Sequence, residues 1–428
     1  MDRLEELERK NKSLGEALDE LGALNQIATA IGSSLSLEEV NERIVQLVVK
    51  RVGASQGGVF LLPEKGESKM QTMVRVKATG SQDDPARLGT AFIGWVIKNQ
   101  RPIKISRNDD PEGFLKQSTG NVESALSVPI KSQGKLIGAL SVFNKRMSDS
   151  FTDGDKRLLS IVAAQSAQVI EKMRLFEVEK HLTEIKKELS VARIIQGEFL
   201  PSECPKINGY DIYAVNLQAD DVGGDSYDII QLSDSKLLFS LSDVCGHGIA
   251  AALMMAMAQT VIRAQLESKT NALDDLGAFV SGVSDYIQRN SKARHFVTSF
   301  IGVLDLDSHS LEYVRAGHPP GMLVDAEGNM TELDQGGLPL GIVKGTKYGS
   351  STVAFPADGR LLVYSDGVTE LPNEKNEQFG AANLAEYVKN EAKSESTKFC
   401  ENLINVLKNY RGKAAQDDDV TLLTVRRF

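Results

Sequence analysis

Four acidic segments in the second half of the chain carry the residues best suited to chemistry. They are VGGDSYD at residues 222–228, SDVCGHG at 242–248, SDG at 365–367 and DDDVT at 417–421. Apolar, strand-like runs adjoin three of them, at residues 236–242, 360–365 and 421–425. A strand that ends in a tight turn is a place where a rigid scaffold presents functional side chains.

Carboxylates from four separate segments could together hold divalent cations. Hard cations take oxygen ligands and keep water positions, and one carboxylate can bridge two of them. Each acid alone could equally be a turn residue or a helix cap, because Asp-Gly is common turn chemistry. No single acid indicates a metal site, but the acids of all four segments taken together indicate a two-metal site.

The segment Gly223-Gly224-Asp225 can also be compared with the Gly-Gly-Asp-Glu-Phe loop of nucleotide cyclases. Ser226 and Tyr227 stand where that loop has Glu and Phe. The second metal-binding acid of the loop is therefore missing, and the sequence disfavours a cyclase.

The four segments, in this order, resemble the PPM family of metal-dependent Ser/Thr protein phosphatases, in its bacterial SpoIIE/RsbU-like branch. The resemblance runs from about residue 188 to residue 428. It also includes ARIIQ at 192–196, Leu200-Pro201, RAGHPP at 315–320 and GLPLG at 337–341.

Carried over by position, the resemblance implies a set of metal ligands. They are Asp225, Asp243 with the backbone carbonyl of Val244, Asp366 and Asp418. Asp228 and Asp419 lie beside the family positions, and we expect them to support the ligands or the fold. The same four aspartates are the expected catalytic residues.

The resemblance implies an α/β sandwich for residues 201–428, with two antiparallel sheets flanked by helices. It also implies direct hydrolysis of phosphoserine or phosphothreonine by water that two Mn²⁺ or Mg²⁺ ions, bridged by Asp243, activate. His247 and His318 could each donate a proton to the leaving group, although a structural role suits both better. Eukaryotic members have a phosphate-binding Arg ahead of the first acidic segment; here no Arg lies between Arg193 and Arg263.

Sequence patterns place several elements in this region. We expect helices at residues 249–266 and 271–290, and strands at 296–305, 310–316, 321–324 and 330–333.

Residues 21–173 form a mixed α/β pattern. We expect helices at 37–52 and 91–98, strands at 57–62 and 70–76, a hairpin of 125–130 with 136–143, and a last helix that opens near Thr152. The pattern resembles a GAF domain, through LG at 88–89, GWV at 94–96, SVPI at 127–130, IGAL at 137–140 and FTD at 151–153.

The ligand of this GAF-like domain stays open. Asn144, Lys145, Phe151 and Asp155 partly match the Asn-Lys-Phe-Asp-Glu signature of cyclic-nucleotide-binding GAF domains, with Lys156 in place of the final Glu. The domain has no cysteine, which excludes a thiol-attached bilin. A small-molecule ligand and a purely structural, dimerising role are both open.

Two segments have the heptad spacing of a coiled coil. In residues 1–25 the seam would be Leu4, Leu7, Asn11, Leu14, Leu18, Leu21 and Asn25. In residues 174–200 it would be Leu175, Val178, Leu182, Ile185, Leu189, Ala192, Gln196 and Phe199, and Leu200-Pro201 would end the helix. Asn at a positions favours a parallel pair, so we expect a homodimer; the alternatives are a helix on its own domain and a passive spacer.

Charge and composition limit the function classes. The 428 residues carry a net charge of −9, and the acidic excess lies within residues 201–428, which disfavours nucleic-acid binding. No apolar run approaches the ~20 residues that span a bilayer, and the start has no signal-peptide pattern, so we expect no membrane attachment and a cytoplasmic protein. Cys204, Cys245 and Cys400 lack metal-site spacing and are expected to be reduced thiols.

These patterns predict an α+β multi-domain chain. It has a coiled coil at 1–25, a GAF-like sensor at 21–173, a linker helix at 174–200 and a phosphatase domain at 201–428. The resemblance implies a GAF-regulated phosphatase that acts on a phosphorylated anti-anti-sigma (STAS-type) protein in bacterial partner switching. The alternatives are a non-catalytic sensor or scaffold, which the intact aspartate set argues against, and a ligand-binding regulator whose phosphatase activity is incidental.

Overall fold

The computed structural model describes residues 37–62, 71–77, 90–117, 121–268, 273–291 and 295–428. The chain divides into two compact units, Met1–Glu184 and Ile185–Phe428. The coiled coil predicted for residues 1–25 and the LG pair at 88–89 lie outside the described residues.

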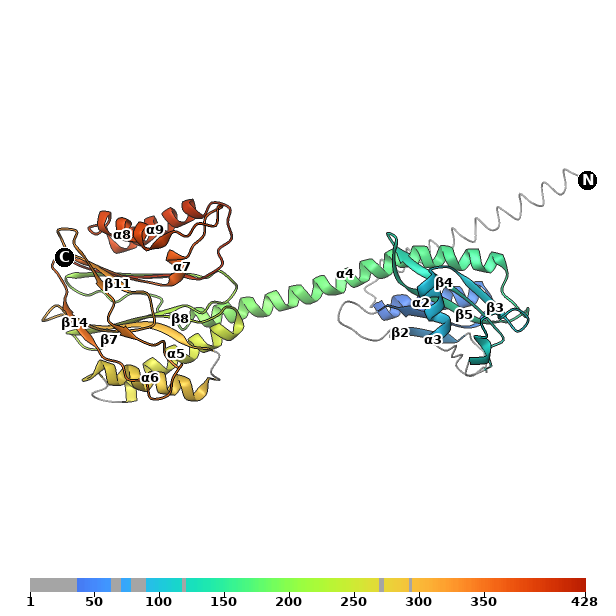
Figure 1. Ribbon diagram of the computed structural model, residues 1–428, viewed down its shortest axis with the longest axis horizontal. Coiled ribbons are helices and arrows are strands. Elements are labelled where there is room, and N and C mark those ends of the chain that lie inside the picture. Colours follow the sequence, from blue (N-terminus) through green and yellow to red (C-terminus); the bar gives the residue numbers. More distant parts are fainter. Residues whose placement is uncertain (1–36, 63–70, 78–89, 118–120, 269–272, 292–294) are drawn as a thin grey trace, which may run out of the picture. The chain divides into compact units, whose positions relative to one another are not determined.

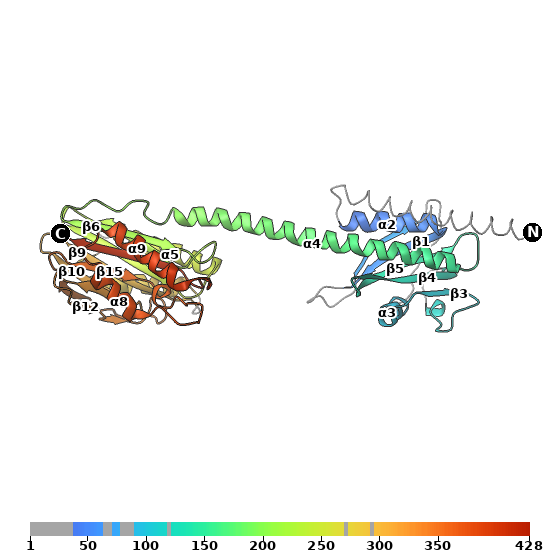
Figure 2. The same ribbon diagram turned by 90° about the horizontal axis from the view of Figure 1, so that it is seen from above.

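The first unit is built on one five-stranded antiparallel sheet, in the order β2-β1-β5-β4-β3. The strands are β1 (Ala54–Leu61), β2 (Gln71–Lys77), β3 (Ile103–Ser106), β4 (Ser124–Ser132) and β5 (Lys135–Lys145). The helices α2 (Leu37–Arg51) and α4 (Asp153–Gly197) cover one face, and α3 (Thr90–Asn99) covers the other (Figure 2). A short 3-10 helix, η1 (Leu115–Gln117), precedes β4.

The two faces of this sheet bury different residues of the same strands. In β1, Val59 and Leu61 join the apolar core under α2 and α4, whereas Phe60 joins the core under α3. This alternation follows because successive side chains of a strand point to opposite faces.

The predicted elements of this unit are present, with bounds shifted by a few residues. The hairpin turns through Gln133 and Gly134, whose φ angles of 48° and 81° are both positive, as a tight two-residue turn requires. The α4 helix opens with a reciprocal pair, in which Thr152 N donates to Asp155 Oδ2 and Asp155 N donates to Thr152 Oγ1. Such a capping box fixes the start of a helix.

The residues behind the cyclic-nucleotide hypothesis bond within the domain. Lys145 Nζ donates to both carboxylate oxygens of Asp155 at 2.9 Å and to the carbonyl of Val52 at 2.8 Å. It also lies 5.8 Å from the ring centroid of Phe151. The side chain of Asn144 bonds backbone groups of the segment before β4. These contacts tie β5 to the start of α4 and give the motif a structural role.

The α4 helix corrects the predicted linker seam at its end. Leu175, Val178, Leu182 and Ile185 are exposed, as an unpaired seam would be. Gln196 is only 5% exposed and packs inside the second unit, so its assignment to the seam was wrong. The helix ends at Gly197, so Phe199 and Leu200 lie beyond it.

The second unit contains two stacked sheets. One has the order β13-β10-β9-β8-β7 with β14 also paired to β10, and the other has the order β12-β11-β15-β16-β6. All pairs are antiparallel except β10 with β13. The strands are β6 (Tyr210–Leu217), β7 (Ser226–Gln231), β8 (Lys236–Val244), β9 (Val297–Asp305), β10 (Ser310–Ala316), β11 (Gly321–Val324), β12 (Met330–Leu333), β13 (Gly336–Gly337), β14 (Ser351–Ala354), β15 (Arg360–Tyr364) and β16 (Val420–Arg427).

Helices cover both outer faces of this sandwich (Figure 1). The helices α5 (Ile249–Ser268) and α6 (Leu276–Asn290) pack on the β8 sheet, and α8 (Gly380–Asn390) and α9 (Ser396–Arg411) pack on the β16 sheet. Side chains of both sheets, such as Phe239 and Leu423, form the core between them. The predicted α/β sandwich is therefore present.

One helix corrects the expectation about apolar runs. Within the described ranges, Ile249–Glu267 is long and apolar enough to cross a membrane by length and composition. Its inner side chains, including Met255, Ala258 and Ile262, are buried in the core under the β8 sheet, and 33% of the apolar span is buried within the fold.

The Lys145–Asp155 pair provides a test of this fold. We expect Lys145→Met to lower the free energy of unfolding of the first unit by about 1.5–3 kcal/mol, because Asp155 loses a charged hydrogen-bond partner. Trp95 is the only tryptophan and lies in α3, so its fluorescence during urea unfolding reports this unit alone. Lys135→Met, at an exposed hairpin position, is the control; equal midpoints for both variants would contradict the structural role.

Candidate metal centre

The acidic segments meet because each lies at the end of a paired strand. Asp225 directly precedes β7 and Asp243 is the penultimate residue of β8, and the pairing of Ser226 with Ser242 puts both at one end of that sheet. The other sheet repeats this arrangement, because Tyr364 of β15 pairs with Leu422 of β16.

The second pair of acids extends from that end of the β16 sheet. Asp366 follows β15 and is the first residue of α7 (Asp366–Thr369), and Asp418 lies two residues before β16. A hydrogen bond of 2.5 Å from Thr421 Oγ1 to Asp225 Oδ2 joins the two sheets at this place. Residues almost 200 positions apart in the sequence thus form one site.

Burial and neighbouring charges raise the pKa values of all four aspartates. Burial, and then the charge of Asp243, raises the pKa of Asp225 well above its usual value. Burial, and then the charges of Asp366 and Asp418, raises the pKa of Asp243 to about 7. Burial is also the first cause of the raised pKa values of Asp366 and Asp418. Gathered carboxylates disfavour one another's ionisation.

This donor set fits hard divalent cations. Within the described ranges, no group of three or more His, Cys, Asp or Glu side chains is arranged so that it could hold a metal ion. The four carboxylates are nevertheless oxygen donors whose mutual repulsion a cation would relieve. The backbone carbonyl of Val244 lies close to the first acidic segment, since it would be 3.0 Å from a Cβ built on Gly224.

Asp419 holds the first acidic segment in place. It is 6% exposed, and its carboxylate accepts from Ala219 N at 2.8 Å and from Asp225 N at 3.3 Å. A Cβ on Gly223 would lie 2.1 Å from Asp419 Oδ2, and a Cβ on Gly367 would lie 2.1 Å from Asp419 O. The two glycines are needed because Asp419 lies against their backbones.

Two hydroxyl groups that the sequence reasoning missed complete this arrangement. Ser365 Oγ donates to the carbonyl of Asp419 at 3.2 Å and accepts from Thr421 N at 3.0 Å. Thr421 in turn orients the carboxylate of Asp225. Their place next to acids in SDG and DDDVT was the signal that could have identified them.

Asp228 lies away from these contacts. Its side chain is 1% exposed and forms a two-point ion pair with Arg263 of α5, at 2.7 and 2.8 Å. It also accepts from the backbone N–H of Ile229. Asp228 therefore joins β7 to α5 and has a structural role.

The two histidines occupy contrasting environments. The side chain of His247 is 85% exposed, with Nδ1 3.6 Å from Asp220 Oδ2. His318 is 1% exposed and its Nδ1 lies 3.0 Å from Thr298 Oγ1. Burial, and then the nearby charge of Arg315, lowers the pKa of His318 to about 3. His318 is thus neutral at pH 7, which favours a structural role.

The RAGHPP and GLPLG segments pack on one another. Gly317 has a φ of 69°, and a Cβ there would lie 2.4 Å from Pro339 Cγ. Its N–H donates to the carbonyl of Gly337 at 2.9 Å. These segments brace β9, whose Thr298 pairs with Asp243.

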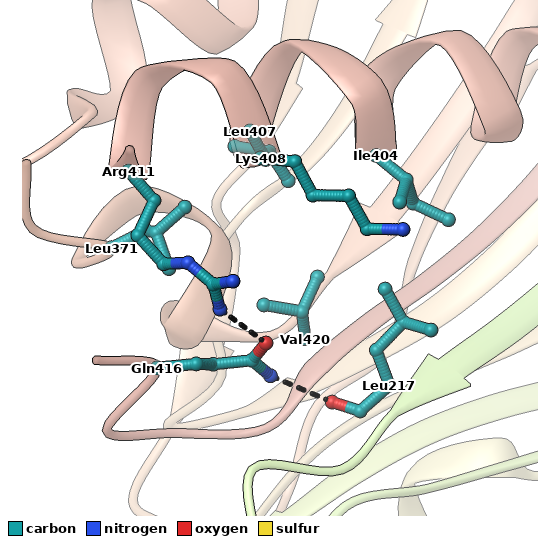
Figure 3. Close-up of a pocket in the computed structure, with 8 residues that line it drawn as sticks. All are labelled: Leu217, Leu371, Ile404, Leu407, Lys408, Arg411, Gln416 and Val420. Carbon is teal, nitrogen blue, oxygen red and sulfur yellow. Dashed lines mark hydrogen bonds between the residues drawn. The ribbon is translucent and has the colours of Figure 1, made fainter. Parts of the chain in front are cut away.

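A small pocket adjoins the last acidic segment (Figure 3). It has a volume of about 50 Å³ and lies between α9 and residues 416–420, with Leu217, Leu371 and Lys408 among its lining. Gln416 accepts from Arg411 at 3.2 Å and donates to the carbonyls of Leu217 and Asp418. Ligand pockets usually measure roughly 300–1,000 Å³, so this pocket is too small to suggest a ligand site. The hydrogen bonds of Gln416 instead hold the segment that carries Asp418.

Comparison with protein families identifies the two parts of the chain. Residues 233–428 match the family described as stage II sporulation protein E (SpoIIE), and residues 34–171 match the GAF domain. The chain therefore contains a GAF domain followed by a SpoIIE-type PPM phosphatase domain.

Two similar curated proteins come from Bacillus subtilis. The phosphoserine phosphatase RsbP is 28% identical over 186 residues, which cover 43% of this chain and 46% of RsbP. The phosphoserine phosphatase RsbU is 27% identical over 245 residues, which cover 57% of this chain and 71% of RsbU. The chain spans less than half the length of RsbP and of one further relative.

A solved structure shares the fold of the second unit. The SiaA-PP2C domain of Pseudomonas aeruginosa superposes with a TM-score of 0.52 at 22% identity, over 58% of this chain and 98% of that domain.

The buried neutral His318 makes acid stability a test. Its pKa is about 6.5 in an unfolded chain and about 3 in the fold, so stability present above pH 6.5 is lost as the pH falls, by up to about 1.4 kcal/mol per pH unit. We expect His318→Gln to flatten the decline of the urea midpoint between pH 7 and 5, measured by circular dichroism. The control is His247→Gln, at an exposed site. If the urea midpoint of His318→Gln declined as steeply as that of the parent, His318 would not be buried in its neutral form.

Proposed function

We propose that this chain, in which a GAF domain precedes a SpoIIE-type PPM phosphatase domain, is a metal-dependent protein-serine/threonine phosphatase. One observation carries the proposal: two aspartates extend from each sheet and meet at one end of the sandwich. They are Asp225 and Asp243 from one sheet, and Asp366 and Asp418 from the other. RsbP and RsbU, named phosphoserine phosphatases, support the reaction type.

In this proposal the four aspartates and the carbonyl of Val244 hold two Mn²⁺ or Mg²⁺ ions. When bound, such ions lower the pKa of water and offset charge on phosphoryl oxygens. The remaining tasks belong to the chain. Thr421 orients Asp225 by donating to its Oδ2, and Asp419 fixes the backbone that carries Asp225. None of these tasks needs a nucleophilic Ser, Cys or His.

We also propose a phosphorylated STAS-type protein as the substrate, acting in cytoplasmic partner switching. Support comes from the resemblance to the SpoIIE/RsbU-like branch and from the similarity to RsbU and RsbP. The GAF domain would be the regulatory input, with a small-molecule ligand or a structural role. The proposed domain limits are 21–173 for the GAF domain and 201–428 for the phosphatase, joined by a linker at 174–200.

A homodimer through α4 completes the proposal. Leu175, Val178, Leu182 and Ile185 have exposed fractions of 64, 51, 54 and 39%, and their 3-4-3 spacing puts them on one stripe of the helix. A second copy of the chain would cover this apolar stripe with its own.

Metal dependence tests the reaction. We expect Asp243→Asn to abolish Mn²⁺-dependent release of phosphate from phospho-STAS substrates, because a neutral amide is a much weaker ligand than a carboxylate for a hard divalent cation. Asp366→Asn should behave alike. Asp228→Asn is the matched control, since its loss of the Arg263 pair should lower stability by about 1–3 kcal/mol and leave turnover largely intact. Substantial turnover by folded Asp243→Asn protein would refute the site, and an inactive parent with bound Mn²⁺ would favour the scaffold hypothesis.

Oligomeric state tests the dimer. We expect light scattering to give twice the chain mass at tens of micromolar, where a short coiled coil is populated by mass action. Leu182→Asp should shift the protein toward the monomer by burying a charge in the seam. Thr183→Asp, one position away and off the stripe, should remain dimeric. A monomeric parent, or equal masses for both variants, would contradict an α4 dimer.

A further inference from the structure

The last turn of α4 reaches into the candidate metal centre through Gln196. Its Nε2 donates to the carbonyl of Gly223 at 2.6 Å, and its Oε1 accepts from the N–H of Gly223 at 3.1 Å. One side-chain amide therefore binds both backbone polar groups of a single residue. The amide orientation follows from chemistry, because a backbone N–H can only donate and a carbonyl can only accept.

Neighbouring groups hold Gln196 in this position. Gln218 Nε2 donates to Gln196 Oε1 at 2.9 Å, and Gln196 is buried. On the adjacent helix, Gln259 Nε2 donates to the carbonyl of Phe199 at 2.6 Å. The end of α4 is thus bonded to the first acidic segment, and the residues that follow it are bonded to α5.

The bonded residue lies where the backbone most needs support. Gly223 and Gly224 directly precede Asp225, and glycine has the greatest backbone freedom of any residue. Asp419 fixes Ala219 and Asp225 on either side, which leaves residues 220–224 between two anchors. Loss of the Gln196 bonds would leave buried backbone groups of Gly223 unpaired, which is costly.

We propose that Gln196 is a positioning residue for Asp225: it fixes the backbone of Gly223 and so sets the place of the first carboxylate in the metal centre. The metal part of this inference rests on the proposed function. Because Gln196 belongs to α4, a displacement of the last turn of that helix would also displace Asp225.

The test compares three variants in the full chain. Gln196→Met keeps the length of the side chain and removes both bonds, so it separates bonding from packing. Gln196→Glu keeps an acceptor for Gly223 N–H and places an oxygen against the carbonyl of Gly223, so it should not restore the parent. Arg193→Ala, at an exposed position on the same helix, is the control.

The first measurement is hydrogen exchange of metal-free protein, followed in peptides that cover residues 219–226. We expect exchange at least about tenfold faster in Gln196→Met and Gln196→Glu than in the parent. The Met variant removes the acceptor of Gly223 N–H, and the Glu variant displaces the pair because its second oxygen repels the carbonyl of Gly223. The β8–β9 peptides serve as the internal reference and should not change. The control variant should match the parent throughout.

The second measurement is Mn²⁺ binding by calorimetry. Loss of a group that orients a metal ligand typically weakens metal affinity by roughly 10–100-fold, and we expect Gln196→Met to fall in this range. Gln218→Ala, which removes only the bond that orients the Gln196 amide, should give a smaller loss. It also provides a readout if the Gln196 variants do not fold.

The outcomes separate this inference from the proposed function. Parental exchange at 219–226 and parental Mn²⁺ affinity in a folded Gln196→Met protein would overturn the positioning role. A parent that binds no Mn²⁺ would overturn the proposed function, while faster exchange at 219–226 in Gln196→Met would still establish that Gln196 fixes Gly223.

Discussion

The arrangement of the second unit follows from one constraint, the repulsion among carboxylates gathered at one end of a sandwich. Burial raises the pKa values of Asp225, Asp243, Asp366 and Asp418, and the charges of neighbouring aspartates further raise those of Asp225, Asp243 and Asp418, so the assembled site is costly before any cation binds. It is held together because two acids extend from each sheet and the sheets share a large apolar core. The free energy of that core keeps the like charges close.

Neutral donors complete this scaffold. Thr421 donates to Asp225, Ser365 bonds the backbone beside Asp419, and backbone N–H groups bond the Asp419 carboxylate. A Lys or Arg in these places would satisfy the same acceptors, but its charge would compete with a cation for the aspartates. Asp419, which is buried beside the four expected ligands, therefore organises the backbone, and Asp228 is kept apart by its ion pair with Arg263.

The sequence predicted the elements whose pattern is local. The strands at 310–316, 321–324 and 330–333 match to the residue, because alternating burial and turn residues mark them. The strands β6, β7 and β14 and the helices α8 and α9 were not predicted. The supporting contacts of the site were also missed, since bonds such as Thr421 to Asp225 join residues 196 positions apart, a separation that no periodicity records.

Gln196 shows why a correct pattern can still misplace a residue. Its position continues the heptad spacing of α4, yet both polar atoms of its amide are bonded, Nε2 to Gly223 and Oε1 to Gly223 and Gln218. Ala192 and Leu189, about one and two turns earlier, are half-buried, whereas Leu175 to Ile185 are exposed. The burial of this one helical stripe therefore changes along its length. A side chain cannot pack in a seam and bond Gly223 at once, so any coiled coil formed by α4 must end before the turn that holds the first carboxylate.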